Sequence, residues 1–285
     1  MARPIRGYPY AIVKALPRFP MVPLTRWGAV ADLFIVFVAV VAGQVAMGGL
    51  AGWLIHTFPS LGILWLNVLI GLVSLASVGL VLCARRQSPA SIGLGKPPAG
   101  RTLVGALAAV PACYIAVFAT VGIYVAVAGI DIQGMAEERE KFFEMVPDLS
   151  IGTVLMITVF VGLHEEILFR GFVLSRLSVL FGRPVIAVFA SGIVFGLLHF
   201  YQGPIGVAQT TAVGLVLAGV VVLTRTLWPA ILAHAAFDTI GLTLIPLLRG
   251  RMQDLLDQLG AIAIGSAFSP IFAACHAASL VAKPA

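Results

Sequence analysis

Two adjacent glutamates and several histidines interrupt stretches of sequence that are otherwise apolar. An ionisable side chain at membrane depth costs a few kcal/mol, so each one calls for a partner or a function. Seven such groups fall in three of the apolar stretches: His164, Glu165, Glu166, Arg170, His199, His234 and Asp238. This concentration indicates a hydrated polar interior that could carry out acid–base chemistry or handle ions.

The spacing of the first group predicts different roles for the two glutamates. In a helix, Glu166 and Arg170 are four residues apart and share a face, with the acid on the amino-terminal side as an ion pair prefers. Glu165 points about 100° away and has no cation within its own helix. We therefore expect Arg170 to neutralise Glu166, and Glu165 to remain available as a general base.

The other two groups repeat the four-residue spacing. His234 and Asp238 share one helical face, so the carboxylate can orient the imidazole or help to bind what the imidazole binds. Phe195 lies one turn before His199 and could wall the cavity and hold the ring. The structural alternative is an interhelical polar network, but Ser, Thr and Asn would build such a network at lower cost.

Three isolated groups have simpler interpretations. Asp32, His56 and His276 have no neighbouring ionisable residue in sequence. We interpret them as an interfacial carboxylate, a loop residue and a packing histidine, respectively.

The composition defines the elements that must position these groups. Of 285 residues, 60% are hydrophobic and 11% are charged, which excludes a water-soluble domain. Its three distant cysteines offer no disulfide framework. We predict an all-α bundle of about eight transmembrane helices. The expected spans are 28–50, 61–83, 102–129, 150–174, 185–201, 205–223, 228–248 and 259–282.

The basic residues predict the topology. With both termini in the cytoplasm, 14 of the 18 Lys and Arg residues lie on the inner side. They sit between the spans rather than in a run, so no nucleic-acid partner is expected. We predict a basic cytoplasmic segment at 1–27 and a single transmembrane domain at 28–285, with its motif core at 150–245. The expected location is a prokaryotic inner (cytoplasmic) membrane.

Three motifs occur in order on the late spans: EExxxR at 165–170, FxxxH at 195–199 and HxxxD at 234–238. Together they resemble the CPBP family of intramembrane endopeptidases, which includes the CAAX prenyl proteases and is named as a metalloprotease family. The SIGLG stretch at 91–95 is similar to a connection usual in that family. The third motif often ends in Asn there, so the aspartate adds a negative charge.

The resemblance implies a role for each motif residue. Glu165 and His199 would activate the attacking water, while His234 and Asp238 would stabilise the oxyanion or complete the site. Either the site is free of metal, or His199, His234 and Glu165 hold one zinc ion; we favour the former. The residues expected to have positioning roles are Glu166, Arg170 and Phe195.

We therefore predict an endopeptidase that cuts a membrane-embedded or lipidated peptide at or within the bilayer. HExxH, GxSG and GxGD motifs are absent from the sequence, which argues against other intramembrane proteases. The alternatives are a proton- or cation-coupled transporter and a catalytically silent scaffold. One difficulty is depth: Glu165 lies about 22 Å along its span, whereas His199 falls near the outer end of its own.

Overall fold

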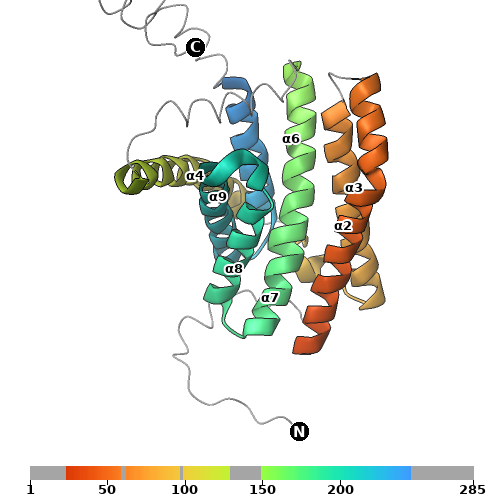
Figure 1. Cartoon of the computed structure of the whole chain (residues 1–285). Coiled ribbons are helices and arrows are strands. Elements are labelled where there is room, and N and C mark those ends of the chain that lie inside the picture. Colours follow the sequence, from red (N-terminus) through yellow and green to blue (C-terminus); the bar gives the residue numbers. More distant parts are fainter. Residues whose placement is uncertain (1–23, 59–61, 97–98, 129–148, 245–285) are drawn as a thin grey trace, which may run out of the picture. The chain divides into compact units, whose positions relative to one another are not determined.

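The computed structural model describes residues 24–58, 62–96, 99–128 and 149–244 (Figure 1). The chain divides into two compact units, residues 1–239 and 240–285. Of the second unit only residues 240–244 are described, and they are helical. The first unit contains every residue of the three motifs. The predicted eighth span at 259–282, His276 and most of the basic segment at 1–27 lie outside the described residues.

The described residues form helices joined by turns, with no strand among them. The prediction of an all-α fold is confirmed for this part of the chain. The last described helix covers residues 228–244. The elements before it are α2 (Arg26–Thr57), α3 (Gly62–Ala84), η1 (Pro89–Ile92), α4 (Ala99–Ala128), α6 (Ile151–Glu166), η2 (Ile167–Val173), α7 (Leu174–Phe181), α8 (Pro184–Leu197), η3 (Phe200–Gln202) and α9 (Gly203–Thr224).

Five stretches of helix in the described part of the chain are long and apolar enough to cross a membrane. They correspond to the predicted first, second, third, fourth and sixth spans, so the full count of eight is not confirmed. Large apolar side chains such as Phe34, Phe37 and Phe118 are exposed on these helices. Apolar exposure on this scale is expected where lipid replaces water around a bundle.

Several helices pack against helices that are not their neighbours in the sequence. Helix α9 packs against α4 and α8, while α2 packs against α3 and α7, and α3 against α6 (Figure 1). The SIGLG connection contacts the residues that follow α9. The Gly93 carbonyl accepts a hydrogen bond from the Leu227 amide at 3.0 Å, and the Gly95 carbonyl accepts one from the Trp228 indole at 3.0 Å. This connection therefore anchors the start of the helix that carries the HxxxD motif.

The predicted fourth span is one continuous helix with a change of pitch. Ser150 caps α6 by accepting a hydrogen bond from the Thr153 amide at 3.2 Å. Immediately after Glu166 the α-helix widens into η2, a seven-residue π-helix, before α7 continues. π-Helical segments inside α-helices are rare and occur frequently at functional sites. Here the segment separates the paired glutamates from the rest of the helix.

A glycine allows α6 to approach the helix at 228–244 closely. A Cβ atom at Gly162 would lie 3.1 Å from the Ala235 backbone nitrogen and 3.2 Å from the Ile231 carbonyl oxygen. Such separations are tighter than ordinary van der Waals contact, so a larger residue would push the helices apart. One turn further along α6, the two glutamates are consequently within reach of His234.

Candidate active site

The predicted ion pair within the first motif is confirmed. The Arg170 Nη1 atom donates to Glu166 Oε1 at 2.7 Å, and both side chains are almost completely buried, with 1% and 0% of their surface exposed. The pair joins the last residue of α6 to the π-helix. A buried carboxylate requires such a partner because an unpaired charge is very costly in a low-dielectric interior.

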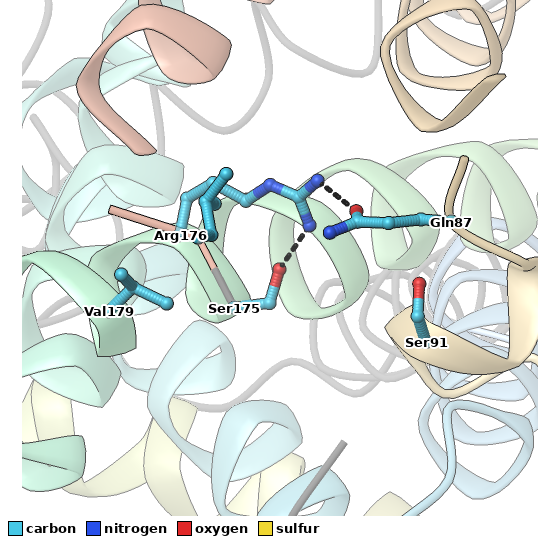
Figure 2. A pocket seen from close by; sticks show the side chains of 6 residues that line it. Gln87, Ser91, Ser175, Arg176 and Val179 are labelled. Carbon is cyan, nitrogen blue, oxygen red and sulfur yellow. Dashed lines mark hydrogen bonds between the residues drawn. The ribbon is translucent and has the colours of Figure 1, made fainter. Parts of the chain in front are cut away.

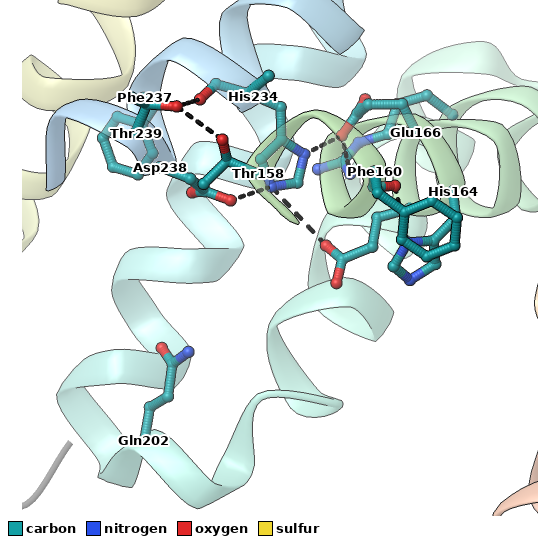
Figure 3. Close-up of polar contacts among 12 residues, drawn as sticks. Thr158, Phe160, His164, Glu166, Gln202, His234, Phe237, Asp238 and Thr239 are labelled. Atoms are coloured by element: carbon teal, nitrogen blue, oxygen red, sulfur yellow. Dashed lines mark hydrogen bonds and ion pairs between the residues drawn. The ribbon is translucent and has the colours of Figure 1, made fainter. Parts of the chain in front are cut away.

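Glu166 has a second partner that its helix does not supply. The same Oε1 atom accepts a hydrogen bond from His234 Nδ1 at 2.8 Å (Figure 3). Because Nδ1 donates here, the orientation of the imidazole is set by a carboxylate that Arg170 itself holds. Glu166 thus positions a histidine ring as well as stabilising its own helix.

The opposite nitrogen of His234 faces two further carboxylates. Its Nε2 atom lies 3.4 Å from Asp238 Oδ2 (Figure 3). The same atom lies 3.8 Å from Glu165 Oε2. The contact between His234 and Asp238 is the one expected from their four-residue spacing. Three carboxylates therefore surround one imidazole, two from α6 and one from the helix of His234 itself.

The two glutamates differ in exposure as the helical geometry predicts. Glu166 is fully buried, whereas 18% of the Glu165 side chain and 27% of the Asp238 side chain remain exposed. The carboxylates on the Nε2 side of His234 are thus the accessible ones. A water molecule or a peptide carbonyl arriving at the site would meet Glu165 and Asp238, not Glu166.

Phe195 connects the second motif to the first and third. Its ring centroid lies 4.7 Å from that of His199 and 6.2 Å from that of His234. The Arg170 guanidinium lies 4.1 Å from the same ring, within the range of a cation–π interaction. The predicted packing of Phe195 against His199 is confirmed, and its contact with Arg170 is additional.

The His199 ring is held by its own helix. Its Nδ1 atom lies 2.8 Å from the Phe195 carbonyl oxygen. A carbonyl can only accept, so Nδ1 carries the hydrogen and the Nε2 atom of the neutral ring is left as an acceptor. His164 is arranged in the same way, with Nδ1 donating to the Phe160 carbonyl at 3.1 Å, and is buried beside the Phe160 ring.

The predicted fifth span is shorter in the structure. The sequence predicted a span at 185–201, but α8 ends at Leu197 and is 14 residues long. At 1.5 Å per residue this is about 21 Å, less than the ~30 Å hydrocarbon core. His199 follows in the turn before α9 and is not part of a membrane-length helix.

The acids and imidazoles of the three motifs include atoms that could bind a metal ion. No group of three or more His, Cys, Asp and Glu side chains within the described ranges is placed to hold one. His234 directs Nδ1 to Glu166, and His199 directs Nδ1 to a backbone carbonyl, so the Nε2 atoms are the ones that a metal ion would have to use. The zinc site at His199, His234 and Glu165 therefore stays a prediction.

Sequence reasoning missed three features of this site. It gave Glu166 a role only within its own helix, because the partner at His234 is 68 residues away. It did not foresee the π-helix, for which the sequence carries no simple signal. It also ignored Gly162, although a glycine one turn before a polar motif could have indicated close helix packing.

Comparison with known proteins identifies a family that resembles part of the chain. Residues 147–240 match the sequence model of the family described as type II CAAX prenyl endopeptidase, Rce1-like. No curated protein and no solved structure gives a significant match to the chain. The matched range contains all three motifs and begins just before α6.

Proposed function

Because the chain belongs, through residues 147–240, to the Rce1-like type II CAAX prenyl endopeptidases, a family of membrane proteases, we propose how it performs peptide-bond hydrolysis. Our proposal is that Glu165 and His199 activate a water molecule that attacks a peptide carbonyl within the bundle. The substrate would be a membrane-embedded or lipidated peptide, as the family and the exposed apolar helix faces suggest. The protein is an integral membrane protein.

A single observation carries the assignment of the general base to Glu165. Glu165 is partly exposed and has its carboxylate 3.8 Å from His234 Nε2, whereas Glu166 beside it is buried and engaged by Arg170 and His234. One glutamate is thus fixed in a structural role, and the other is available to accept a proton. A scaffold would gain nothing from this division, whereas a hydrolase needs it.

The chemical steps follow from the donor and acceptor atoms. Glu165 takes a proton from water as the water oxygen bonds to the scissile carbonyl carbon, with His199 Nε2 accepting a hydrogen bond that orients the water. His234, held by Glu166, donates from Nε2 to the developing oxyanion. When the C–N bond breaks, Glu165 returns the proton to the leaving nitrogen, so protons and charge balance.

Asp238 is proposed to complete the site beside His234. Its carboxylate lies 3.4 Å from the His234 Nε2 atom and is more exposed than Glu165. It can keep the ring protonated at Nε2 until the oxyanion forms, and then yield that hydrogen bond. This role differs from that of a neutral asparagine, which could itself donate to the oxyanion.

The experiment is cleavage of a quenched fluorescent lipidated or transmembrane peptide by the full-length protein in liposomes. The Glu165→Gln substitution should lower kcat/KM by about 10²- to 10⁴-fold, the usual contribution of a general base. His199→Ala should do the same, whereas His56→Ala, which alters an exposed histidine at the end of α2, should not. Undiminished cleavage by Glu165→Gln would refute the assignment.

Two further measurements separate the alternatives. Ion flux measured in the same liposomes should be absent with and without peptide; flux coupled to substrate would favour a transporter. Metal analysis of the purified protein should give no stoichiometric zinc. Zinc that is bound in the natural sequence and lost in His199→Ala would favour the zinc mechanism instead.

A further inference from the structure

A second polar cluster lies apart from the candidate site, where α2 begins and where α3 and α7 end. Asp32 is the only acidic residue in the described parts of α2, α3 and α7 and of the connection at 85–96. The same elements carry Lys96 and four arginines, so their net charge is +4. We call the four arginines the arginine cluster: Arg26, Arg85, Arg86 and Arg176.

Direct contacts bring the cluster together. Asp32 is buried and binds Arg85 Nη2 at 2.7 Å and Arg176 Nε at 3.4 Å. A Cβ atom at Gly182 would lie 3.9 Å from Arg26 Nη2, so the start of α2 meets the end of α7. The ends of three helices therefore share one basic surface, although Asp32 has no ionisable neighbour in sequence.

The buried member of the cluster has a structural role. Arg176 donates from Nη2 to Gln87 Oε1 at 2.6 Å and from Nη1 to Ser175 Oγ at 3.0 Å (Figure 2). Its guanidinium also lies 4.3 Å from the Phe172 ring centroid. A small pocket opens beside these groups, with Ser91 on its wall (Figure 2). Arg176 thus links α7 to the connection that follows α3.

The remaining arginines face outward. Arg26 and Arg86 are exposed, and 38% of the Arg85 side chain is exposed even though it binds Asp32. Within the described part of these elements Asp32 is the only carboxylate, and Arg85 and Arg176 already share it. The exposed guanidinium groups can therefore bind an anion from outside the protein.

Arg86 adopts a backbone conformation that costs energy. Its φ is +52°, and the Gln87 amide bonds the Leu82 carbonyl at 2.8 Å, which is the helix ending in which glycine is the usual residue at the left-handed position. Glycine would fit there without strain. An arginine at this position is explained if its positive charge binds an anion.

Exposed aromatic residues indicate what surrounds the cluster. Trp27, next to Arg26, is 82% exposed, and Phe181 at the end of α7 is also exposed. Tryptophan beside basic residues at the ends of apolar helices is typical of the boundary between hydrocarbon and lipid headgroups. The partner that this surface meets is thus a lipid headgroup layer.

We propose that the arginine cluster binds the phosphate groups of anionic phospholipids. The shared Asp32 holds three helix ends together, and the outward arginines supply the donors for phosphate oxygens. Because the cluster is separate from the three motifs, this proposal does not depend on the peptidase assignment. It predicts a preference for lipid charge at one defined place on the protein.

The test is native mass spectrometry of the full-length protein in detergent, titrated with phosphatidylglycerol or phosphatidylcholine. We expect phosphatidylglycerol to bind at least about fivefold more tightly, since each basic residue near anionic lipid contributes about that factor. Arg86→Gly and Arg26→Gln should each reduce phosphatidylglycerol binding about fivefold and leave phosphatidylcholine unchanged. Arg86→Gly also relieves strain, so its thermal stability should be unchanged or higher.

Three outcomes would overturn the proposal. Equal binding of the two lipids would show that the charge is not used for lipid. An equal loss in Arg101→Gln, which removes an exposed arginine near the start of α4, would show a diffuse field and no defined site. Displacement of phosphatidylglycerol by inorganic phosphate alone would indicate a site for a free anion.

Discussion

Replacing the buried Glu166 with methionine should destabilise the protein by about 3–5 kcal/mol. Glu166 Oε1 accepts hydrogen bonds from Arg170 Nη1 at 2.7 Å and from His234 Nδ1 at 2.8 Å. Hydrogen bonds to charged groups contribute about 1.5–3 kcal/mol each, which gives a loss of the same size. The substitution also leaves Arg170, of which 1% is exposed, as an uncompensated buried charge.

A double-mutant cycle isolates the direct interaction. Arg170→Met alone should cost a similar amount, because it leaves the carboxylate of Glu166 with only the imidazole as a partner. Replacing both residues with methionine removes both charges and leaves only His234 Nδ1 without an acceptor, at a cost of about 1–3 kcal/mol. The double variant should therefore be more stable than the sum of the single losses predicts, by at least about 2 kcal/mol.

Unfolding can be followed through a buried thiol. Cys113 is completely buried, whereas Cys83 is exposed. In a background with Cys83→Ser and Cys275→Ser, reaction of Cys113 with a thiol-reactive fluorophore at increasing denaturant reports opening of the bundle. Additive losses in the cycle would refute the inference that Glu166 and Arg170 stabilise the fold as a pair.

Three further substitutions test the surrounding structure. Gly162→Ala should lower kcat/KM about tenfold, because the added methyl group pushes α6 away from the helix at 228–244. The control Gly152→Ala adds a Cβ that meets only one atom at 3.9 Å and should not lower kcat/KM, so equal activities of the two variants would contradict the close packing at Gly162. Phe195→Leu should lower the free energy of unfolding by about 2 kcal/mol, measured with the thiol probe. The control Phe189→Leu alters an exposed ring and should change it by no more than about 0.5 kcal/mol, so equal losses would argue against the cation–π contact. Asp32→Asn should cost about 3–5 kcal/mol in the same assay, and a loss below about 1 kcal/mol would mean that its arginine contacts are not stabilising.

Contacts within a helix were predicted well because helical periodicity is a local property. The pairs Glu166 with Arg170 and His234 with Asp238 are four residues apart and are in contact in the structure. The different exposure of Glu165 also follows from the angle between neighbouring residues. The predicted first, second, third, fourth and sixth spans coincide with helices long and apolar enough to cross a membrane, since apolar runs of this length specify membrane helices, whereas α8 is shorter than the predicted fifth span.

Contacts between helices were predicted poorly. The bond from His234 to Glu166 depends on how deeply two helices sit and how each is rotated, and no local pattern encodes either quantity. Asp32 was treated as an isolated carboxylate, although it binds two arginines from other parts of the chain.

The sequence by itself determined that this protein is a helical membrane protein with acids and imidazoles at fixed helical spacing, because hydrophobic length and periodicity act locally. Only the tertiary structure decided which carboxylate holds His234. That choice accompanies the close approach of the two helices at Gly162 and the π-helix that begins after Glu166. Each of these changes the rotation or depth of one helix against another, and such changes are resolved only when all the packed surfaces are satisfied together.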